Sequence, residues 1–445
     1  MCKKWLWKLI MLMLPVLVTA CQTQVEHRDL LDLQLLPQNL TAYVVTDNAA
    51  RALLPAERQK QWSDDYRRRF LAPWQATWEG RPIHELFGIR EWLLNNLVFG
   101  SNYRPVPLQL RQQWLLLCAE TEFPNADYPA ITLRASNIRG LPTRQPAFYD
   151  FTLPGEGFPF DYLQNSSIPA SVPVRVRQHS ADGGWLLVET DAMFGWIPAT
   201  DVAPVDEAFI RQYTTSAWSV VTQDDVLLTG DDGDVLATAA LGSIWVQSMP
   251  DKVWVAMRGD NGHATLRPAA MPAGAAQPFP LPLTPGLMAE LGNHLLGKPY
   301  DWGGQFGGRD CSATVRDLFA CFGLYLPRNS AGQAKVGERL NLKHLPAKER
   351  ERFIMSQAEP WLSLAYMPGH IMLYVGIFKD QPVFLHTLWG VKTKNRHAKA
   401  GRHLVGQTVI TGLRPGDELS DLMRPEGLLL ERIEGMVLLG GVAEP

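Results

Sequence analysis

Residues 300–322 constrain the fold of this chain more than any other stretch, because they bring a single cysteine to the expected start of a helix. A glycine-rich and aromatic approach leads to Cys311. Apolar residues then recur at Val315, Leu318, Phe319 and Phe322. This spacing is typical of the buried face of an amphipathic helix. Gly323 stands where a helix-ending glycine is expected, so we predict a helix that begins at the cysteine.

The position of Cys311 makes it a candidate nucleophile. The unpaired N–H groups and the positive dipole end of a helix N-terminus both favour the reactive thiolate. Four glycines lie within residues 303–308, and glycine lets a backbone approach a ligand closely. A cysteine that only fills space needs no such approach, although an ordinary buried cysteine remains the alternative.

The first 21 residues have the pattern of a targeting segment. Lysines precede an apolar run from Leu9 to Val18, which is too short to span a bilayer. The run ends in small residues before Cys21 and resembles a bacterial lipoprotein signal, which implies removal of residues 1–20 and acylation of Cys21. Gln22, in place of aspartate, favours the outer membrane of a Gram-negative bacterium, facing the periplasm. A plain secretory signal is the alternative.

Composition narrows the range of partners. The chain has 445 residues, enough for about three domains, and its net charge of −3 gives no basic footprint for nucleic acid. The five cysteines are scattered and form neither a disulfide framework nor a paired metal motif. With Cys21 acylated, the mature chain keeps Cys118, Cys311 and Cys321 as thiols. We expect a monomer with no cofactor and no bound metal.

The chain divides into successive regions that differ in composition and in the spacing of apolar residues. A polar tether is expected over residues 21–40, and a helical N-terminal domain over residues 41–129, where apolar residues and tryptophans follow a helical spacing. These tryptophans are expected in a core. The alternative is that the helices form a lid over a cleft.

Short strand-like runs between turns then predict two small β-barrels, over residues 130–205 and 206–272. In the first, Trp185 followed by Gly195-Trp-Ile resembles the bacterial SH3-like module. A linker rich in proline and glycine is expected over residues 273–286, before a last domain over residues 287–445.

Two histidines in the last domain are candidate partners of the cysteine. His370 opens an unbroken apolar run, which is typical of a buried strand, and His386 closes a second strand-like run. An antiparallel pairing in which residue numbers sum to 756 sets the two histidines directly opposite each other on one face. We therefore predict Cys311 as nucleophile, His370 as base and His386 as the group that orients the base. A zinc site of these three residues is the alternative.

Four motifs then resemble the NlpC family of cell-wall cysteine peptidases over about residues 290–445. They are Tyr300-x-Trp-Gly-Gly, Asp310-Cys-Ser, Leu326-Pro-Arg-x-Ser and Pro368-Gly-His-Ile-x-x-Tyr-Val-Gly. The resemblance implies a multidomain α+β protein with a papain-like catalytic domain and a Cys-His-His triad, behind two SH3-like barrels and a helical region. The domain order also resembles γ-D-glutamyl-L-diamino acid endopeptidases, which cut peptidoglycan peptides between D-Glu and meso-diaminopimelate next to a free L-Ala amine.

The resemblance also suggests substrate contacts. Asp310 can pair with the ammonium group, and Ser312 and Ser330 can hydrogen-bond to the α-carboxylate of D-Glu. Tyr300 can position the scissile amide or its oxyanion, and Tyr162 of the first barrel can form an aromatic wall. For Asp310 the alternative is a helix N-cap without contact to the substrate. For Tyr300 and Ser330 the alternative is likewise a purely structural role.

Three functions are the resulting hypotheses. The first is a lipid-anchored endopeptidase acting on peptidoglycan peptides. The second is a peptidoglycan-binding lipoprotein without catalysis, and the third is amide hydrolysis or acyl transfer on another substrate, which the same fold supports. Whether intact sacculi or only short free peptides reach the cysteine is left open by the sequence.

Overall fold

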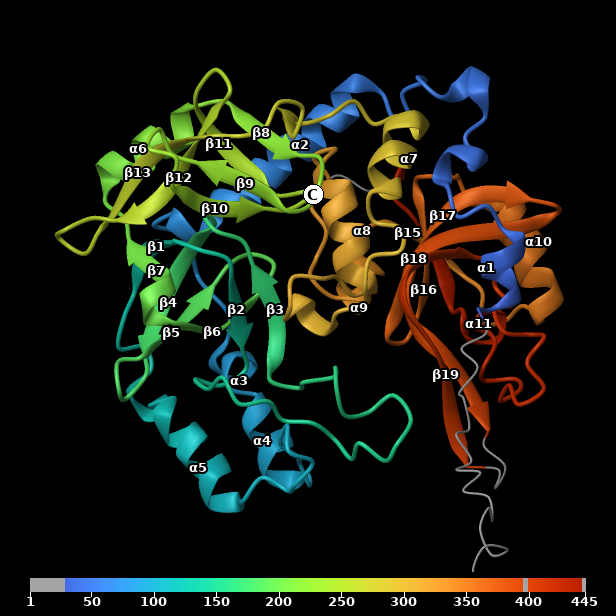
Figure 1. The fold of residues 1–445 in the computed structure, drawn as a ribbon, viewed down its shortest axis with the longest axis horizontal. Coiled ribbons are helices and arrows are strands. Elements are labelled where there is room, and N and C mark those ends of the chain that lie inside the picture. Colours follow the sequence, from blue (N-terminus) through green and yellow to red (C-terminus); the bar gives the residue numbers. More distant parts are fainter. Residues whose placement is uncertain (1–28, 395–398, 442–445) are drawn as a thin grey trace, which may run out of the picture.

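The computed structural model describes residues 29–394 and 399–441 (Figure 1). The expected signal segment and Cys21 lie outside the described residues. Over the two described ranges, no helix is both long and apolar enough to cross a membrane.

The N-terminal helices do not form one separate domain, as residues 41–129 were expected to. Helix α2 packs into the core of the C-terminal domain through Trp62, whereas Leu93 and Trp114 share a core with Trp196 of the first barrel. The helices are α1 (Leu31–Leu35), α2 (Ala56–Leu71), α3 (Ile83–Leu86), α4 (Ile89–Asn95) and α5 (Leu108–Leu117). The region therefore joins two domains instead of standing beside them.

The expected tether is also packed over its described part. Leu30 is buried in a cluster with Leu388 and Val409 of the C-terminal domain. The side chain of Gln38 donates to the carbonyl of Ile410 and accepts from its N–H. These contacts fix residues 29–40 against the sheet, and the apolar side chains of Leu30 and Leu36 are buried away from water, which stabilises the contact.

The first barrel lies where the sequence predicts it. It is an antiparallel sheet in the order β3-β2-β6-β5-β4-β1-β7, and Trp196 is fully buried against it. Its strands are β1 (Tyr128–Thr132), β2 (Ser136–Arg139), β3 (Gln164–Ile168), β4 (Pro173–His179), β5 (Trp185–Glu189), β6 (Phe194–Pro198) and β7 (Val202–Pro204). A long loop between β2 and β3 reaches toward the C-terminal domain (Figure 1).

A second antiparallel sheet follows helix α6 (Glu207–Thr215), in the order β10-β9-β13-β12-β11-β8-β14. Its strands are β8 (Trp218–Val221), β9 (Val226–Thr229), β10 (Val235–Ala239), β11 (Ile244–Met249), β12 (Lys252–Arg258), β13 (Ala264–Ala270) and β14 (Ala276–Pro278). Strand β14 falls inside the expected linker 273–286, because Ala276 pairs with Val221 at the edge of this sheet. The linker prediction is wrong over these residues.

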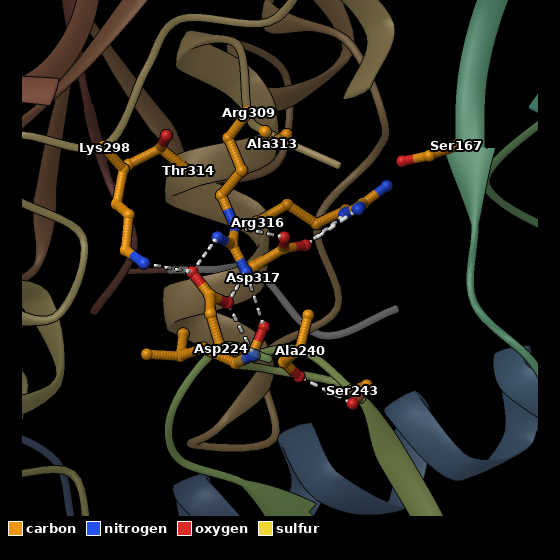
Figure 2. A network of polar contacts seen from close by, with 12 residues as sticks. Ser167, Asp224, Ala240, Ser243, Lys298, Arg309, Ala313, Thr314, Arg316 and Asp317 are labelled. Atoms are coloured by element: carbon orange, nitrogen blue, oxygen red, sulfur yellow. Dashed lines mark hydrogen bonds and ion pairs between the residues drawn. The ribbon is translucent and has the colours of Figure 1, made fainter. Parts of the chain in front are cut away.

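The second sheet is anchored to the segment that leads to Cys311. Arg309 is buried and donates two hydrogen bonds of 2.8 Å to the carboxylate of Asp224, and its Nε donates to Asp317 at 2.8 Å. Figure 2 shows these side chains converging between the sheet and the helix that carries Asp317. Gly242 has a positive φ of 84° and lies against the carbonyl of Asp317, where a Cβ would clash. The nucleophile segment is therefore braced by another domain.

The C-terminal domain places helices against an antiparallel sheet in the order β15-β20-β16-β17-β18-β19. Its strands are β15 (Glu338–Asn341), β16 (Ser363–Met367), β17 (His370–Phe378), β18 (Gln381–Lys394), β19 (Ala400–Thr411) and β20 (Gly435–Leu438). Its helices are α7 (Pro285–Asn293), α8 (Cys311–Ala320), α9 (Ser330–Gln333), α10 (Ala347–Gln357) and α11 (Leu429–Arg432). Leu318, Phe319 and Phe322 are fully buried with Ile371 and Leu373, so the predicted apolar face of α8 is confirmed.

Candidate active site

Cys311 is the first residue of α8, as predicted, and Asp310 is its N-cap. The cysteine is 8% exposed and lies in the wall of a cleft of about 1730 Å³. Tyr162, Tyr300, Asp310, Ser312 and Ser330 line the same cleft. The structure thus brings the predicted nucleophile and all five predicted substrate contacts to one surface.

The two histidines share one face of the sheet, but their register differs from the predicted one. Leu373 pairs with Leu385 and Tyr374 with Phe384, so residue numbers sum to 758 here and not to 756. His370 and His386 are therefore diagonal neighbours, and His370 Nε2 lies 2.7 Å from His386 Nδ1. Strand β18 also continues past His386 to Lys394, so this histidine does not close the strand.

The hydrogen bonds beyond the histidines fix their protonation. The hydroxyl of Thr411 donates to the carbonyl of Gly412 at 2.8 Å, so its oxygen accepts at 3.0 Å from His386 Nε2–H. His386 Nδ1 then carries no proton and accepts from His370 Nε2–H. The remaining nitrogen of His370, Nδ1, is left without a proton. An unprotonated nitrogen is what a general base requires. The sequence did not reveal that Thr411 takes part in this series of hydrogen bonds.

The start of β17 lies against the nucleophile. Helix α8 packs on β17 and β18, and the backbone N–H of Ile371 acts to lower the pKa of the Cys311 thiol. Ile371 directly follows His370 in the strand. The strand that begins with the proposed base therefore packs against the helix that begins with the nucleophile.

The resting pair is neutral, contrary to the thiolate expected from a helix N-terminus. Burial and the adjacent carboxylate of Asp310 raise the pKa of the Cys311 thiol to about 12. Burial and the charge of Arg432 lower the pKa of His370 to about 3. Desolvation opposes both charged forms and here exceeds the stabilisation that a helix N-terminus gives to a thiolate. The thiol must therefore lose its proton to His370 during attack on a substrate.

This electrostatic state predicts the reactivity of the cysteine in the absence of substrate. Because the thiol pKa is raised, the thiolate fraction grows with pH, and alkylation of Cys311 by iodoacetamide should accelerate about tenfold per pH unit from pH 7 to pH 10. Peptide mass spectrometry can follow Cys311 separately from Cys118 and Cys321, with Cys311→Ala as the blank. A rate that stays constant between pH 6 and pH 9 would instead reveal a preformed thiolate–imidazolium pair.

Asp310 is the centre of a buried polar network. One oxygen of its carboxylate accepts from the backbone N–H of Ala313 at 2.9 Å, which is the N-cap bond. Arg328 donates to both oxygens at 3.1 and 2.7 Å, and the Ser312 hydroxyl donates to one of them at 2.9 Å. Burial raises the pKa of Asp310, but Arg328 and the hydrogen bonds outweigh it and hold this pKa below its usual value. The cap is confirmed, and the binding of a substrate ammonium group by Asp310 stays a prediction.

Arg328 also ties this network to the first barrel, since its Nε donates to the Ser166 hydroxyl of β3 at 2.7 Å. The sequence motif contains Arg328, but nothing in its spacing shows that it pairs with a residue eighteen positions earlier. In the sequence, Arg328 is a single arginine between apolar and polar residues, and such a residue is expected at the surface.

Two of the four glycines before Cys311 admit the first barrel, and one of these, Gly303, also lines the cleft. Gly303 and Gly304 have positive φ values of 63° and 69°. A Cβ on Gly303 would meet Gln164 of β3, and one on Gly304 would meet the side chain of Ser167. The first barrel therefore occupies the space that the glycines leave open.

Aromatic side chains from two domains line the approach to the cysteine. Tyr162 stacks on Trp92 of α4 with ring centroids 5.1 Å apart, and its hydroxyl donates to Glu156 at 3.2 Å. Tyr300 packs against Trp389 of β18 at 5.3 Å, and Phe160 of the barrel loop packs against the same tryptophan at 5.4 Å. Tyr162 and Tyr300 line the cleft, and Phe160 and Trp389, which the sequence did not reveal, pack on each other and on Tyr300. A role of Tyr162 as an aromatic wall for the substrate stays a prediction.

The two serines that were expected to contact the substrate are less available for it in the structure. Ser330 is the first residue of α9 and half-buried in the cleft wall. Ser312 is buried, and its oxygen already accepts from Arg328 at 3.0 Å. No group of three or more histidine, cysteine or acidic side chains in the described ranges is arranged to hold a metal ion.

A cysteine at a helix start, packed on an antiparallel sheet that carries two bonded histidines, defines a papain-like cysteine-peptidase site. Residues 297–402 match the family model described as NlpC/P60 family, residues 146–198 match an SH3 domain of the SH3b1 type, and residues 10–123 match the N-terminal NLPC_P60 stabilising domain. The C-terminal domain is thus similar to the NlpC/P60 family, and the regions before it are similar to an SH3b domain and to the stabilising domain that accompanies this family.

Two known proteins resemble the chain over different extents. A solved structure described as an NlpC/P60 endopeptidase from Photobacterium damselae subsp. piscicida superposes with a TM-score of 0.83 at 23% identity, over 92% of this chain and 98% of that one. The gamma-D-glutamyl-L-lysine dipeptidyl-peptidase of Bacillus subtilis is 33% identical over 88 residues, which are 20% of this chain and 28% of that relative. The first likeness covers the whole multidomain fold. The SH3 identity of the second sheet stays a prediction.

Proposed function

We propose that the chain is a cysteine endopeptidase that hydrolyses the bond between γ-D-Glu and meso-diaminopimelate in peptidoglycan peptides. The observation that carries the proposal is the series of hydrogen bonds from Thr411 through His386 to His370, which leaves His370 Nδ1 without a proton on a sheet that packs against the helix of Cys311. A histidine that only fills space in the core does not require this series of hydrogen bonds. The match of residues 297–402 to the NlpC/P60 family supports a peptidase acting on the cell wall.

The reaction can be derived from these positions. The thiol proton passes to His370 Nδ1 as the sulfur attacks the γ-carbonyl carbon of D-Glu, forming the S–C bond. His370 then gives this proton to the amine of the departing residue as the C–N bond breaks, leaving a thioester on Cys311. Water, deprotonated by His370, hydrolyses the thioester and restores the thiol. His386 keeps the imidazole of His370 in the correct tautomer throughout.

The donors around the carbonyl complete the proposed site. The backbone N–H of Cys311 is at a helix start and has no partner within the helix, so it can donate to the oxyanion. The Tyr300 hydroxyl is the second proposed donor. Burial and the nearby charges of Asp310 and Cys311 raise the Tyr300 pKa well above its usual value, so it stays protonated and able to donate.

The identity of the bond is tested by product analysis. Incubation with L-Ala-γ-D-Glu-meso-diaminopimelate should release L-Ala-γ-D-Glu and free diaminopimelate, resolved by chromatography and mass spectrometry. Peptides with and without a free L-Ala amine, and intact sacculi, show which substrates enter the cleft. Release of any other fragment would place the cut elsewhere. The absence of cleavage in all substrates would favour a peptidoglycan-binding role.

We further propose that the chain is anchored by acylated Cys21 to the outer membrane and faces the periplasm, where such peptides occur. The support is the lysine-led apolar run that ends at this cysteine. Cys21→Ser should move the protein from the membrane to the soluble fraction and abolish the incorporation of labelled palmitate. An unchanged membrane fraction would contradict the anchor.

A further inference from the structure

Strands β18 and β19 form a hairpin that runs on beyond the catalytic histidine. Strand β17 begins at His370, whereas β18 continues to Lys394 paired with β19. Figure 1 shows the hairpin projecting from the sheet, beside the long loop of the first barrel. Within the hairpin, Lys392 and Arg402 are direct cross-strand partners. Two like charges directly opposite each other are unfavourable in a sheet unless another group compensates them.

A third cation lies at the same end of the sheet. Arg432 ends α11, three residues before Gly435, which pairs with Tyr366 beside the start of β17. The charge of Arg432 contributes to the lowered pKa of His370 and of Lys392. Arg402 in turn interacts with the charge of Arg432 and with Tyr300. Lys392 and Arg402 are thus cross-strand partners, and the charge of Arg432 acts on both of them and on His370.

These cations lack the partners that buried charges usually have. Arg432 and Lys392 are half-buried, and neither side chain forms a hydrogen bond or ion pair with another residue of the described ranges. The Arg402 Nη2 donates to the carbonyl of Pro154 at 3.3 Å, while its buried Nε has no acceptor among the described residues. A buried guanidinium N–H without an acceptor is costly, so it points to a ligand that supplies one.

The neighbouring carboxylates do not neutralise the group. Glu156 interacts with Arg402, but its oxygens accept from the Tyr162 hydroxyl at 3.4 and 3.2 Å. Glu426 interacts with Lys392 and is exposed to solvent. Burial lowers the pKa of Lys392, Arg402 and Arg432 alike. The three residues therefore form a half-buried cluster of positive charge.

The cations lie on the side of the leaving group. In the proposed reaction His370 gives its proton to the departing amine, so the residue that carries this amine must lie next to His370. The acyl side of the substrate occupies the cleft of Tyr162 and Ser330, which Lys392, Arg402 and Arg432 do not line. This position favours contact of the basic cluster with the departing residue or with the peptide attached to its carboxyl end.

We propose that Lys392, Arg402 and Arg432 form an anion subsite that binds a carboxylate of the leaving diaminopimelate residue. This inference rests on the proposed function, and it names the residues that select the leaving group. Diaminopimelate carries a carboxylate at the end of its side chain, and its α-carboxylate is free in a tripeptide. A lysine at the same position keeps the α-carboxylate but lacks the side-chain carboxylate, and its side chain ends only in an ammonium group, which the three cations repel.

Binding to the full chain with Cys311→Ala tests the subsite without turnover. The probes are L-Ala-γ-D-Glu-meso-diaminopimelate, its two monoamides (side-chain or α-carboxyl) and L-Ala-γ-D-Glu-L-Lys, measured by calorimetry. We expect the diacid to bind at least about tenfold more tightly than the monoamide that lacks the contacted carboxylate, since charge-assisted hydrogen bonds are involved. The monoamide that loses affinity shows which carboxylate binds. Adding Arg432→Gln should remove this difference. The lysine peptide should then bind unchanged if the side-chain carboxylate is contacted, and should lose affinity together with the diacid if the α-carboxylate is contacted.

Arg424→Gln is the matched control, because Arg424 pairs with Asp417 near the same helix and lies outside the cluster. It should leave all four affinities unchanged. Equal affinity for the diacid and both monoamides, or an equal loss for all peptides in Arg432→Gln, would overturn the subsite. Failure of the unsubstituted chain to cleave peptides that it binds would instead overturn the proposed function, so the two failures are distinguishable.

Discussion

Cys311→Ala should lower kcat/KM for L-Ala-γ-D-Glu-meso-diaminopimelate by at least about 10³-fold, because removal of the nucleophile leaves only oxyanion stabilisation and binding. Cys311 is the first residue of α8, and its substitution by alanine removes only the thiol group. The backbone N–H and the cap from Asp310 to Ala313 remain. Substrate affinity should therefore persist while turnover is lost. Single-turnover release of L-Ala-γ-D-Glu and calorimetric binding measure the two separately.

Cys321→Ala provides the matched control. This cysteine is fully buried near the end of the same helix, where its thiol donates to the Asp317 carbonyl at 3.6 Å. Its loss should cost some stability through a small cavity and leave kcat/KM unchanged. If Cys321→Ala lowered the activity as much as Cys311→Ala, the effect would reflect damage to α8 and not the loss of a nucleophile.

The sequence predicted helix α8 and the two strands that carry the histidines, because both depend on short-range periodicity. Four apolar positions define the buried face of α8, and a glycine defines its end. The histidines were placed on one face by assuming a regular pairing, yet the turn at Lys379-Asp380 sets a sum of 759, which alone would place them on opposite faces. A bulge between Tyr374 and Gly376 shifts the sum to 758 and restores the shared face. No local residue pattern revealed this bulge.

The remaining differences come from contacts between distant segments. Gly303 and Gly304 were interpreted as a ligand approach, and only the position of β3 shows that they admit the first barrel. Helix α2 looks like part of an independent helical domain until Trp62 is seen in the core of the C-terminal domain. The thiolate expectation failed for a related reason. Helix position can be inferred from sequence, whereas desolvation depends on everything that covers the site.

The second large effect is expected at Arg328, which the sequence left without a role. Arg328→Met should lower the free energy of unfolding by about 3–5 kcal/mol, since removing one partner of a buried ion pair leaves the other charge uncompensated. Arg328 is 7% and Asp310 9% exposed, and the arginine donates to both carboxylate oxygens, to Ser312 and to Ser166 of the first barrel. Urea titration followed by tryptophan fluorescence measures the change.

The comparison that isolates burial is Arg414→Met, because Arg414 also forms a carboxylate pair, with Glu351 at 3.1 Å, but is 40% exposed. That substitution should cost less than about 1 kcal/mol. Adding Asp310→Asn to Arg328→Met should recover part of the loss, since the amide needs no counter-charge and can still cap α8. Equal effects of Arg328→Met and Arg414→Met would show that the buried pair is dispensable. Both Arg328→Met and the double variant should lower kcat, because Arg328 also links the first barrel to the start of α8 beside Cys311.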